Sequence, residues 1–189
     1  MAVFAKGVLE LFCQLRDLPA LVVTNDWFTG LVPAYAKNKK FGEVFNQTRF
    51  FHIIHNLDPL YEGRLYLQPH ENSLQWLHEL PSEWLIDPYW QKRVINPSRC
   101  ALLTADNWGT VSQSYRQDLL FNSPLSSLLA KFPKSFAFPN GINKQQRLLR
   151  LKEVCRSHHE AKTRLQQKYF SFQDLDDSIC LLAFVGRIT

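Results

Sequence analysis

The sequence lacks the features that mark several large classes of protein. Among its 189 residues no stretch reaches the roughly 18–20 uninterrupted apolar residues of a membrane span, so we expect no integral membrane protein. The first residues lack the basic stretch, apolar core and cleavage site of a secretory signal. The four cysteines are widely scattered without a CxxC pair, so neither a zinc site nor a disulfide framework is indicated. We therefore expect a reduced intracellular compartment, namely the cytoplasm.

The short motifs of several enzyme classes are also missing. No GxxxxGK[ST] or GxGxxG loop occurs, which excludes the P-loop and the dinucleotide-binding fingerprint. No GxSxG nucleophile elbow occurs either. His52 and His55 resemble a metal-binding pair, but three positions apart on an extended segment they point to opposite faces. We therefore predict no metal site.

Acidic residues are scarce in one segment. Residues 1–142 hold 13 Lys and Arg against 12 Asp and Glu, whereas residues 143–189 hold nine against five. Within 144–168 there are eight basic and two acidic residues. A nucleic-acid binder more often spreads its charge over a whole face and interleaves it with aromatic side chains. We interpret the segment as a solvated helix face, expect no nucleic-acid partner, and keep nucleic-acid binding by this helix as a distant alternative.

Short continuous apolar runs recur along the rest of the sequence. Each one leads into a polar or glycine-bearing turn, which is typical of strands buried on both faces of a parallel sheet. With 46% hydrophobic residues, the chain is able to bury a sizeable core. The predicted strands are 20–24, 49–54, 100–104, 135–138 and 179–185.

Segments with helical character separate these strands. The segment 8–15 carries apolar residues at i, i+3, i+4 and i+7, which predicts one apolar helix face. The alternation of helices and strands predicts an α/β fold with a mostly parallel sheet. Ligands of such sheets bind at the carboxyl ends of the strands, so the turns there are the candidate site. The other predicted helices are 30–38, 74–80, 88–95, 112–121, 124–131 and 144–170. The carboxylates at strand ends, each a general base or a turn former, are Asp26, Asp58, Glu62 and Asp106.

Five sequence blocks together resemble one enzyme family. NDWFTGLVPAY at 25–35 is similar to the HDWHTGLVPxY block of bacterial glycogen synthases and plant starch synthases. HNL at 55–57, followed by YEG at 61–63, looks like their IHNLxYQG turn. The remaining blocks, in the family's order, are ADNWGTVSQSY at 105–115, PNGI at 139–142 and FVGRIT at 184–189.

The resemblance implies the incomplete N-terminal half of a two-domain GT-B glycosyltransferase with a Rossmann-like, mostly parallel sheet. It implies retaining transfer of glucose from ADP- or UDP-glucose to the non-reducing end of an α-1,4-glucan, with no cofactor and no membrane partner. By this resemblance the catalytic residues are His55, Asn56 and Asp26, and the turn at His55 and Asn56 faces the transferred glucose. Arg187 holds the nucleotide diphosphate, which a guanidinium does well. The implied substrate-binding residues are Trp27, Tyr61, Glu62, Asn140 and Gly141.

The resemblance also implies a division of the chain. Residues 1–143 correspond to part of the acceptor-side catalytic domain, 144–178 to a basic linker helix and loop, and 179–189 to the first strand of the donor-binding domain. The family's Lys-Gly-Gly loop and nearly all of its donor-binding domain have no counterpart here, so we expect this isolated chain to be an inactive fragment. The alternative function is that of a non-catalytic glucan-binding or regulatory relic.

Several positions depart from the family pattern. Asn25 stands where a His is usual, Phe28 replaces a polar residue, and Asn143 replaces a frequent Asp. Two additional residues, Asp58 and Pro59, lengthen the turn that leads to the Tyr-Glu-Gly segment. For two of the implied site residues a structural role remains open: Trp27 in the core and Arg187 in a surface ion pair.

Overall fold

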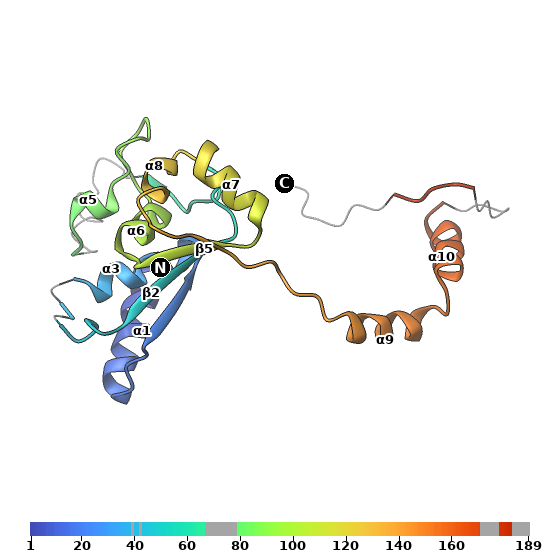
Figure 1. Cartoon of the computed structure of the whole chain (residues 1–189), viewed down its shortest axis with the longest axis horizontal. Helices are drawn as coiled ribbons and strands as arrows, with labels where there is room; N and C mark the ends of the chain where they lie inside the picture. The colour runs from blue at the N-terminus through green and yellow to red at the C-terminus, as the bar shows by residue number, and fades with distance from the viewer. Residues whose placement is uncertain (39, 42, 67–78, 171–177, 183–189) are drawn as a thin grey trace. The chain divides into compact units, whose positions relative to one another are not determined.

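The computed structural model describes residues 1–189 apart from 39, 42, 67–78, 171–177 and 183–189 (Figure 1). The chain divides into two compact units, Met1–Asn140 and Gly141–Thr189, and the first carries the sheet. No helix in the described part of the chain is long and apolar enough to cross a bilayer. The assignment of 1–143, 144–178 and 179–189 to domains of a longer protein stays a prediction.

The first unit is built on a parallel sheet, which confirms the predicted α/β class. Within the described residues the sheet has four strands in the order β1-β2-β5-β6, each paired in parallel with its neighbour (Figure 1). The apolar runs at 20–24, 49–54 and 135–138 form strands as predicted. The strand bounds are β1 Leu21–Asn25, β2 Arg49–Ile54, β5 Asn107–Thr110 and β6 Phe136–Ala137.

Helices cover the face of the sheet on which the alternate β2 residues Phe50, His52 and Ile54 are buried. Phe50 packs into a cluster with α1 and α3, whereas Ile54 packs with α6, α7 and α8. The N-terminal amphipathic helix is confirmed and begins six residues earlier than the predicted segment. The helix bounds are α1 Ala2–Leu15, α2 Asp26–Thr29, α3 Val32–Ala36, α6 Pro97–Thr104, α7 Gln113–Asn122 and α8 Ser126–Leu129.

The opposite face of the sheet is only partly buried, so the prediction of strands buried on both faces is wrong for this unit. Leu21, Val23, Phe136 and Phe138 are between 40 and 55% exposed. Phe51 packs edge-to-face against both phenylalanines of this face, with ring centroids 5.7 and 5.8 Å apart. The apolar runs therefore reflect one helix-covered face and one aromatic face, rather than two helix-covered faces.

The predicted strand at 100–104 is wrong, because these residues end helix α6. The Asn96 side chain caps the helix by accepting a hydrogen bond from the Arg99 backbone N–H at 3.0 Å, and Pro97 occupies the first turn. An Asn cap followed by Pro is a strong helix-start signal, and it outweighs the apolar run that follows. The strand comes later, at β5, so Asp106 precedes a strand instead of following one.

The segment between β2 and α6 is also less helical than predicted. A helix at 88–95 is absent from the described structure: β4 (Val94–Ile95) pairs there with β3 (Leu65–Tyr66) in an antiparallel ladder. A short helix α5 (Ser82–Leu85) precedes β4. Of the predicted helix 74–80, residues 74–78 lie outside the described residues and residues 79–80 form a turn.

The second unit contains two helices where the sequence predicted one. Helix α9 (Lys144–Val154) ends at Cys155, whose backbone is extended, and α10 (His158–Phe170) begins after Ser157. The Ser157 hydroxyl accepts from the Glu160 N–H at 3.1 Å, and the Glu160 carboxylate accepts from the Arg156 N–H at 2.6 Å. This capping arrangement starts a new helix. The predicted strand 179–185 is not formed at 179–182, and 183–185 lie outside the described residues.

His52 is a buried, neutral histidine of β2, in agreement with a structural role. Its Nδ1 lies 2.9 Å from the Thr24 hydroxyl, and its Nε2 has no hydrogen-bond partner among the described residues. Burial lowers the pKa of His52 to about 4, with a smaller contribution from the nearby His55. Because the unfolded chain protonates this ring near its ordinary pKa of 6.5, acid favours unfolding.

We expect the stability of the chain to fall as pH is lowered from about 6.5 to 4, by about 3 kcal/mol from His52 alone. The His52→Gln variant removes this titration and flattens the dependence, whereas His55→Gln, at an exposed position, retains it. Urea unfolding at a series of pH values measures the effect. Equal pH slopes for the wild type and His52→Gln would contradict the assignment.

Candidate functional site

The turns that follow β1 and β2 meet at the carboxyl edge of the sheet. Parallel pairing sets Asn25 opposite Ile53, so the residues after both strands are neighbours. The Asp26 carboxylate oxygen Oδ1 accepts hydrogen bonds from the backbone N–H groups of His55 at 2.7 Å and Asn56 at 3.3 Å. The structure therefore brings together the three residues to which a catalytic role was assigned.

Asp26 holds this position in a left-handed backbone conformation, with φ of 48°. A non-glycine residue in this region costs of order 1–3 kcal/mol and persists only where its surroundings fix it. Two hydrogen bonds provide that fixation: the Thr29 hydroxyl accepts from the Asn25 N–H at 2.6 Å and donates to the Asn25 carbonyl at 2.7 Å. The Asn25 side-chain oxygen also lies 3.0 Å from His55 Nε2, so the residue that replaces the family's usual His contacts the site directly.

Trp27 lies half-buried beside Asp26, with its ring against Gly63. Gly63 has a φ of 67°, and a Cβ atom there would come within 2.5 Å of the indole ring, so the close approach requires glycine. The Tyr61 side chain is 38% exposed on the same loop. The two inserted residues form the turn before it: the Asp58 side chain accepts from the Leu60 N–H at 2.8 Å.

Glu62 differs from its neighbours because its side chain is completely buried. Its carboxylate pairs with Arg64 and accepts a hydrogen bond from the Asn96 amide at 2.7 Å, and Asn96 also donates to Asp87 at 2.8 Å. Burial raises the pKa of Glu62, although Arg64 and Asn96 both favour its ionised form. The predicted substrate contact of Glu62 has no exposed surface to support it. We assign the residue to the scaffold beneath Trp27.

Asp106 lies at the opposite edge of the sheet from Asp26. Its Oδ2 accepts from the Phe50 N–H at 2.8 Å, near the beginning of β2, and its Oδ1 lies 3.5 Å from Arg49 and 3.4 Å from Lys37. Because 100–104 is helical, Asp106 stands at the amino end of β5, where it joins a surface ion cluster. The prediction that Asp106 follows a strand is therefore wrong.

Tyr115, in the first turn of α7, contributes to the site although the sequence analysis does not predict it as a site residue. Its hydroxyl accepts a hydrogen bond from the Leu57 N–H at 2.7 Å, and burial raises the pKa of the phenol. The Ser112 hydroxyl caps α7 by accepting from the Tyr115 N–H at 3.1 Å. The sequence block at 105–115 includes Tyr115, but nothing in that block indicates that Tyr115 contacts the turn after β2.

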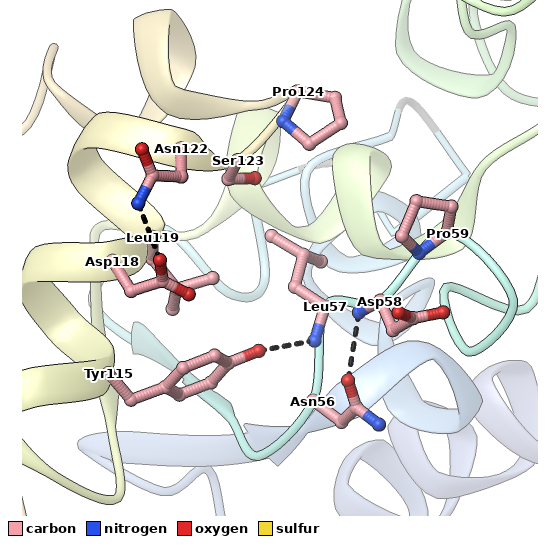
Figure 2. Close-up of a pocket in the computed structure, with 10 residues that line it drawn as sticks. All are labelled: Asn56, Leu57, Asp58, Pro59, Tyr115, Asp118, Leu119, Asn122, Ser123 and Pro124. Carbon is pink, nitrogen blue, oxygen red and sulfur yellow. Dashed lines mark hydrogen bonds between the residues drawn. The ribbon is translucent and has the colours of Figure 1, made fainter.

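A pocket of about 250 Å³ opens between this turn and α7 (Figure 2). Asp118, Leu119 and Asn122 line the α7 side, and Asn56, Leu57 and Asp58 line the other side. No group of three or more His, Cys, Asp or Glu in the described ranges is arranged to hold a metal ion.

The other proposed site residues lie elsewhere in the chain. Asn140 is the last residue of the first unit and Gly141 the first residue of the second, and both are exposed. Arg187 lies outside the described residues, so its proposed phosphate contact remains a prediction.

The parallel sheet, its helix-covered face and its carboxyl-edge turns have the architecture of a partial Rossmann-like half of a GT-B fold. Residues 1–131 match the family model of the starch synthase catalytic domain, and the chain belongs to this family. A likeness to a solved structure shows the same fold. It is the catalytic domain of starch synthase IV from Arabidopsis thaliana bound to ADP and acarbose, with a TM-score of 0.64 and 23% identity over 77% of this chain and 30% of that one.

Three curated relatives are bacterial glycogen synthases. The protein of Geotalea daltonii is 32% identical over 120 residues, which are 63% of this chain and 24% of the relative. The protein of Halalkalibacterium halodurans is 31% identical over 144 residues, which are 74% of this chain and 28% of the relative. The protein of Aliivibrio salmonicida is 24% identical over 190 aligned positions, which cover 88% of this chain and 38% of the relative. The chain thus spans between 24 and 38% of the length of these relatives.

The Asp26 carboxylate is expected to matter for stability as well as for the site. Asp26→Ala leaves two backbone N–H groups without their acceptor and should lower the free energy of unfolding by about 1–3 kcal/mol. Asp26→Asn is the matched control, because an amide oxygen accepts the same bonds and Asn tolerates the left-handed conformation. Urea unfolding of both variants measures the difference, and equal losses would contradict the role of the carboxylate.

Proposed function

We propose that this chain is the acceptor-side part of a starch/glycogen synthase-type glucosyltransferase, which transfers glucose from ADP- or UDP-glucose to the non-reducing end of an α-1,4-glucan. The observation that carries the proposal is the pair of hydrogen bonds that the Asp26 carboxylate accepts from the backbone of the turn at His55 and Asn56. These bonds join two of the family's sequence blocks into one surface. Membership of the family and its bacterial glycogen synthase relatives support it, and for the same reason we propose a cytoplasmic location.

The chemistry of this surface suits a neutral sugar. The imidazole of His55 and the amide of Asn56 are exposed, and both are able to donate or accept hydrogen bonds to hydroxyl groups. The Oδ2 oxygen of Asp26 has no hydrogen-bond partner among the described residues, which leaves it available to accept from a hydroxyl. The half-buried Trp27 ring provides an apolar surface beside these groups. We assign the glucose-facing role to His55 and Asn56, and the acceptor contacts to Asp26, Trp27 and Tyr61.

The negative charge of the surface around Asp26, His55 and Asn56 makes it unsuited to binding the diphosphate leaving group. Asp58 and Asp118 line its pocket, and no Lys or Arg is among the lining residues. The nearby Arg64 donates to the Pro59 carbonyl at 2.6 Å, but its side chain is buried and paired with Glu62. A diphosphate leaving group requires cations that stabilise its developing charge. We propose that Arg187 contributes one of these cations. The others would come from the parts of the longer relatives that this chain does not match.

The 189-residue chain alone is expected to bind maltoheptaose without transferring glucose. The proposed sugar-facing groups are present, whereas no Lys or Arg lines the pocket beside them to stabilise the leaving diphosphate. Isothermal titration measures binding, and incorporation of radiolabelled glucose from ADP- or UDP-glucose into glycogen measures transfer. Incorporation above the blank would contradict the assignment of this chain to one side of the reaction. Absence of maltoheptaose binding would contradict the acceptor-side role.

In a full-length glucosyltransferase that contains this segment, His55→Ala is expected to lower kcat and kcat/KM together by about 10²–10³-fold. This is the scale for losing one contact made mostly in the transition state. His52→Ala, on the same strand but buried beside Thr24, should reduce only thermal stability. Steady-state kinetics on the two purified variants test the contrast. Equal losses of kcat, or a loss confined to His52→Ala, would show that the turn does not face the glucose.

A further inference from the structure

We propose that the pocket between α7 and residues 56–59 is a second sugar subsite, which binds one further glucosyl unit of the glucan acceptor. This inference rests on the proposed function and deepens it. The pocket measures about 250 Å³, below the roughly 300–1,000 Å³ of pockets that enclose drug-sized ligands, so its size suits a single ring. Its lining residues are Asn56, Leu57, Asp58, Pro59, Tyr115, Asp118, Leu119, Asn122, Ser123 and Pro124.

The polar groups of the pocket are oriented by one another and retain free hydrogen-bonding capacity. The Asn122 amide donates to Asp118 Oδ1 at 2.6 Å, from positions i and i+4 of one face of α7 (Figure 2). On the facing wall Asn56 Oδ1 accepts from the Asp58 N–H at 2.8 Å. These bonds leave Asp118 Oδ2, Asn122 Oδ1 and the Asn56 amide nitrogen without a partner among the described residues. The pocket thus offers two acceptors and one donor to hydroxyl groups.

The apolar part of the pocket complements these polar groups. Leu57 and Leu119 are buried, with exposures of 4 and 3%, and Pro59 and Pro124 stand at the rim. A hexose presents hydroxyl groups at its edge and C–H groups on its faces. Buried leucines beside two carboxylates and two amides therefore match both kinds of surface on one sugar ring.

The charge of the pocket argues against other ligand classes. Its two carboxylates, Asp58 and Asp118, have no Lys or Arg beside them in the lining, which disfavours a phosphate or a nucleotide. Arg64 donates to the Pro59 carbonyl at 2.6 Å, but its side chain is buried and its charge is paired with Glu62. Two carboxylates also fall short of a metal-binding cluster, and none is found in the described part of the chain. A neutral polyol is the ligand class that remains consistent with these groups.

The pocket is continuous with the surface around Asp26. Asn56 belongs to both, since its backbone N–H binds Asp26 while its side chain lines the pocket. The wall between them is fixed from both sides: Asp26 accepts from the His55 N–H, and Tyr115 accepts from the Leu57 N–H. One oligosaccharide is thus able to contact both places, which a single glucose is too short to do. We infer that affinity increases with the length of the glucan.

The test compares glucose and maltoheptaose binding to the 189-residue chain by isothermal titration. In the double variant Asp118→Ala/Asn122→Ala, the affinity for maltoheptaose should fall about tenfold, while that for glucose changes less than twofold. Both substitutions remove one mutual hydrogen bond on the exposed surface of α7, so little stability is lost. Gln117→Ala, an exposed neighbour outside the pocket, is the matched control and should bind like the wild type.

Trp27→Ala separates failure of this inference from failure of the proposed function. It should weaken the binding of both sugars. If Trp27→Ala weakens binding and the double variant does not, the pocket is not a subsite, although the acceptor-side function stands. If the wild-type chain binds neither sugar, both proposals are overturned. Binding that weakens strongly at high salt would also overturn the subsite, because a neutral sugar makes no ion pair.

Discussion

The candidate site depends on one interaction: the backbone N–H groups of His55 and Asn56 both donate hydrogen bonds to the Asp26 carboxylate. Parallel pairing places the ends of β1 and β2 side by side, but it does not set the direction of the turns that follow. The carboxylate does, because its two hydrogen bonds connect Asp26, in its left-handed conformation, to the backbone N–H groups of the second turn. A charged acceptor forms stronger bonds to backbone N–H groups than a neutral one. The side chains of His55 and Asn56 are thereby held at the exposed edge.

A buried polar cluster performs the corresponding task for Trp27. The cluster, formed by Glu62, Arg64, Asp87 and Asn96, fixes the loop whose Gly63 contacts the indole ring. Asn96 connects it to α6, because the same side chain caps that helix. Buried ion pairs contribute little net stability once desolvation is counted, but removing one partner is costly. Such a cluster specifies one loop conformation rather than a more stable protein, and precise placement of an aromatic ring is what sugar binding requires.

Much of this arrangement could be predicted from the sequence, and the remainder depends on tertiary contacts. The runs that form β1 and β2, and the polar turns after them, identified the edge where Asp26, His55 and Asn56 meet. The run at 100–104 predicts a strand but forms a helix, because an apolar composition suits a buried helix as well as a strand. Asp106 therefore lies at the amino end of β5 rather than at the carboxyl end of a strand. Whether Glu62 points outward or inward is not encoded in its turn; Arg64 and Asn96 decide it. The bond of Tyr115 joins residues 58 positions apart, which no local pattern reports.

Under the proposed function, the charge of the described surface explains why this unit would serve only one of the two substrates. A glucan is neutral, and its hydroxyl groups donate well to the carboxylates of Asp26 and Asp118. A departing diphosphate carries developing negative charge, and the same carboxylates would oppose it. The two substrates of the proposed reaction therefore require surfaces of opposite electrostatic character. No Lys or Arg lines the pocket beside the turn at His55 and Asn56, so under the proposed function the cations come from a different surface. The turn then lies at the boundary between the surface for the glucan and the surface for the diphosphate.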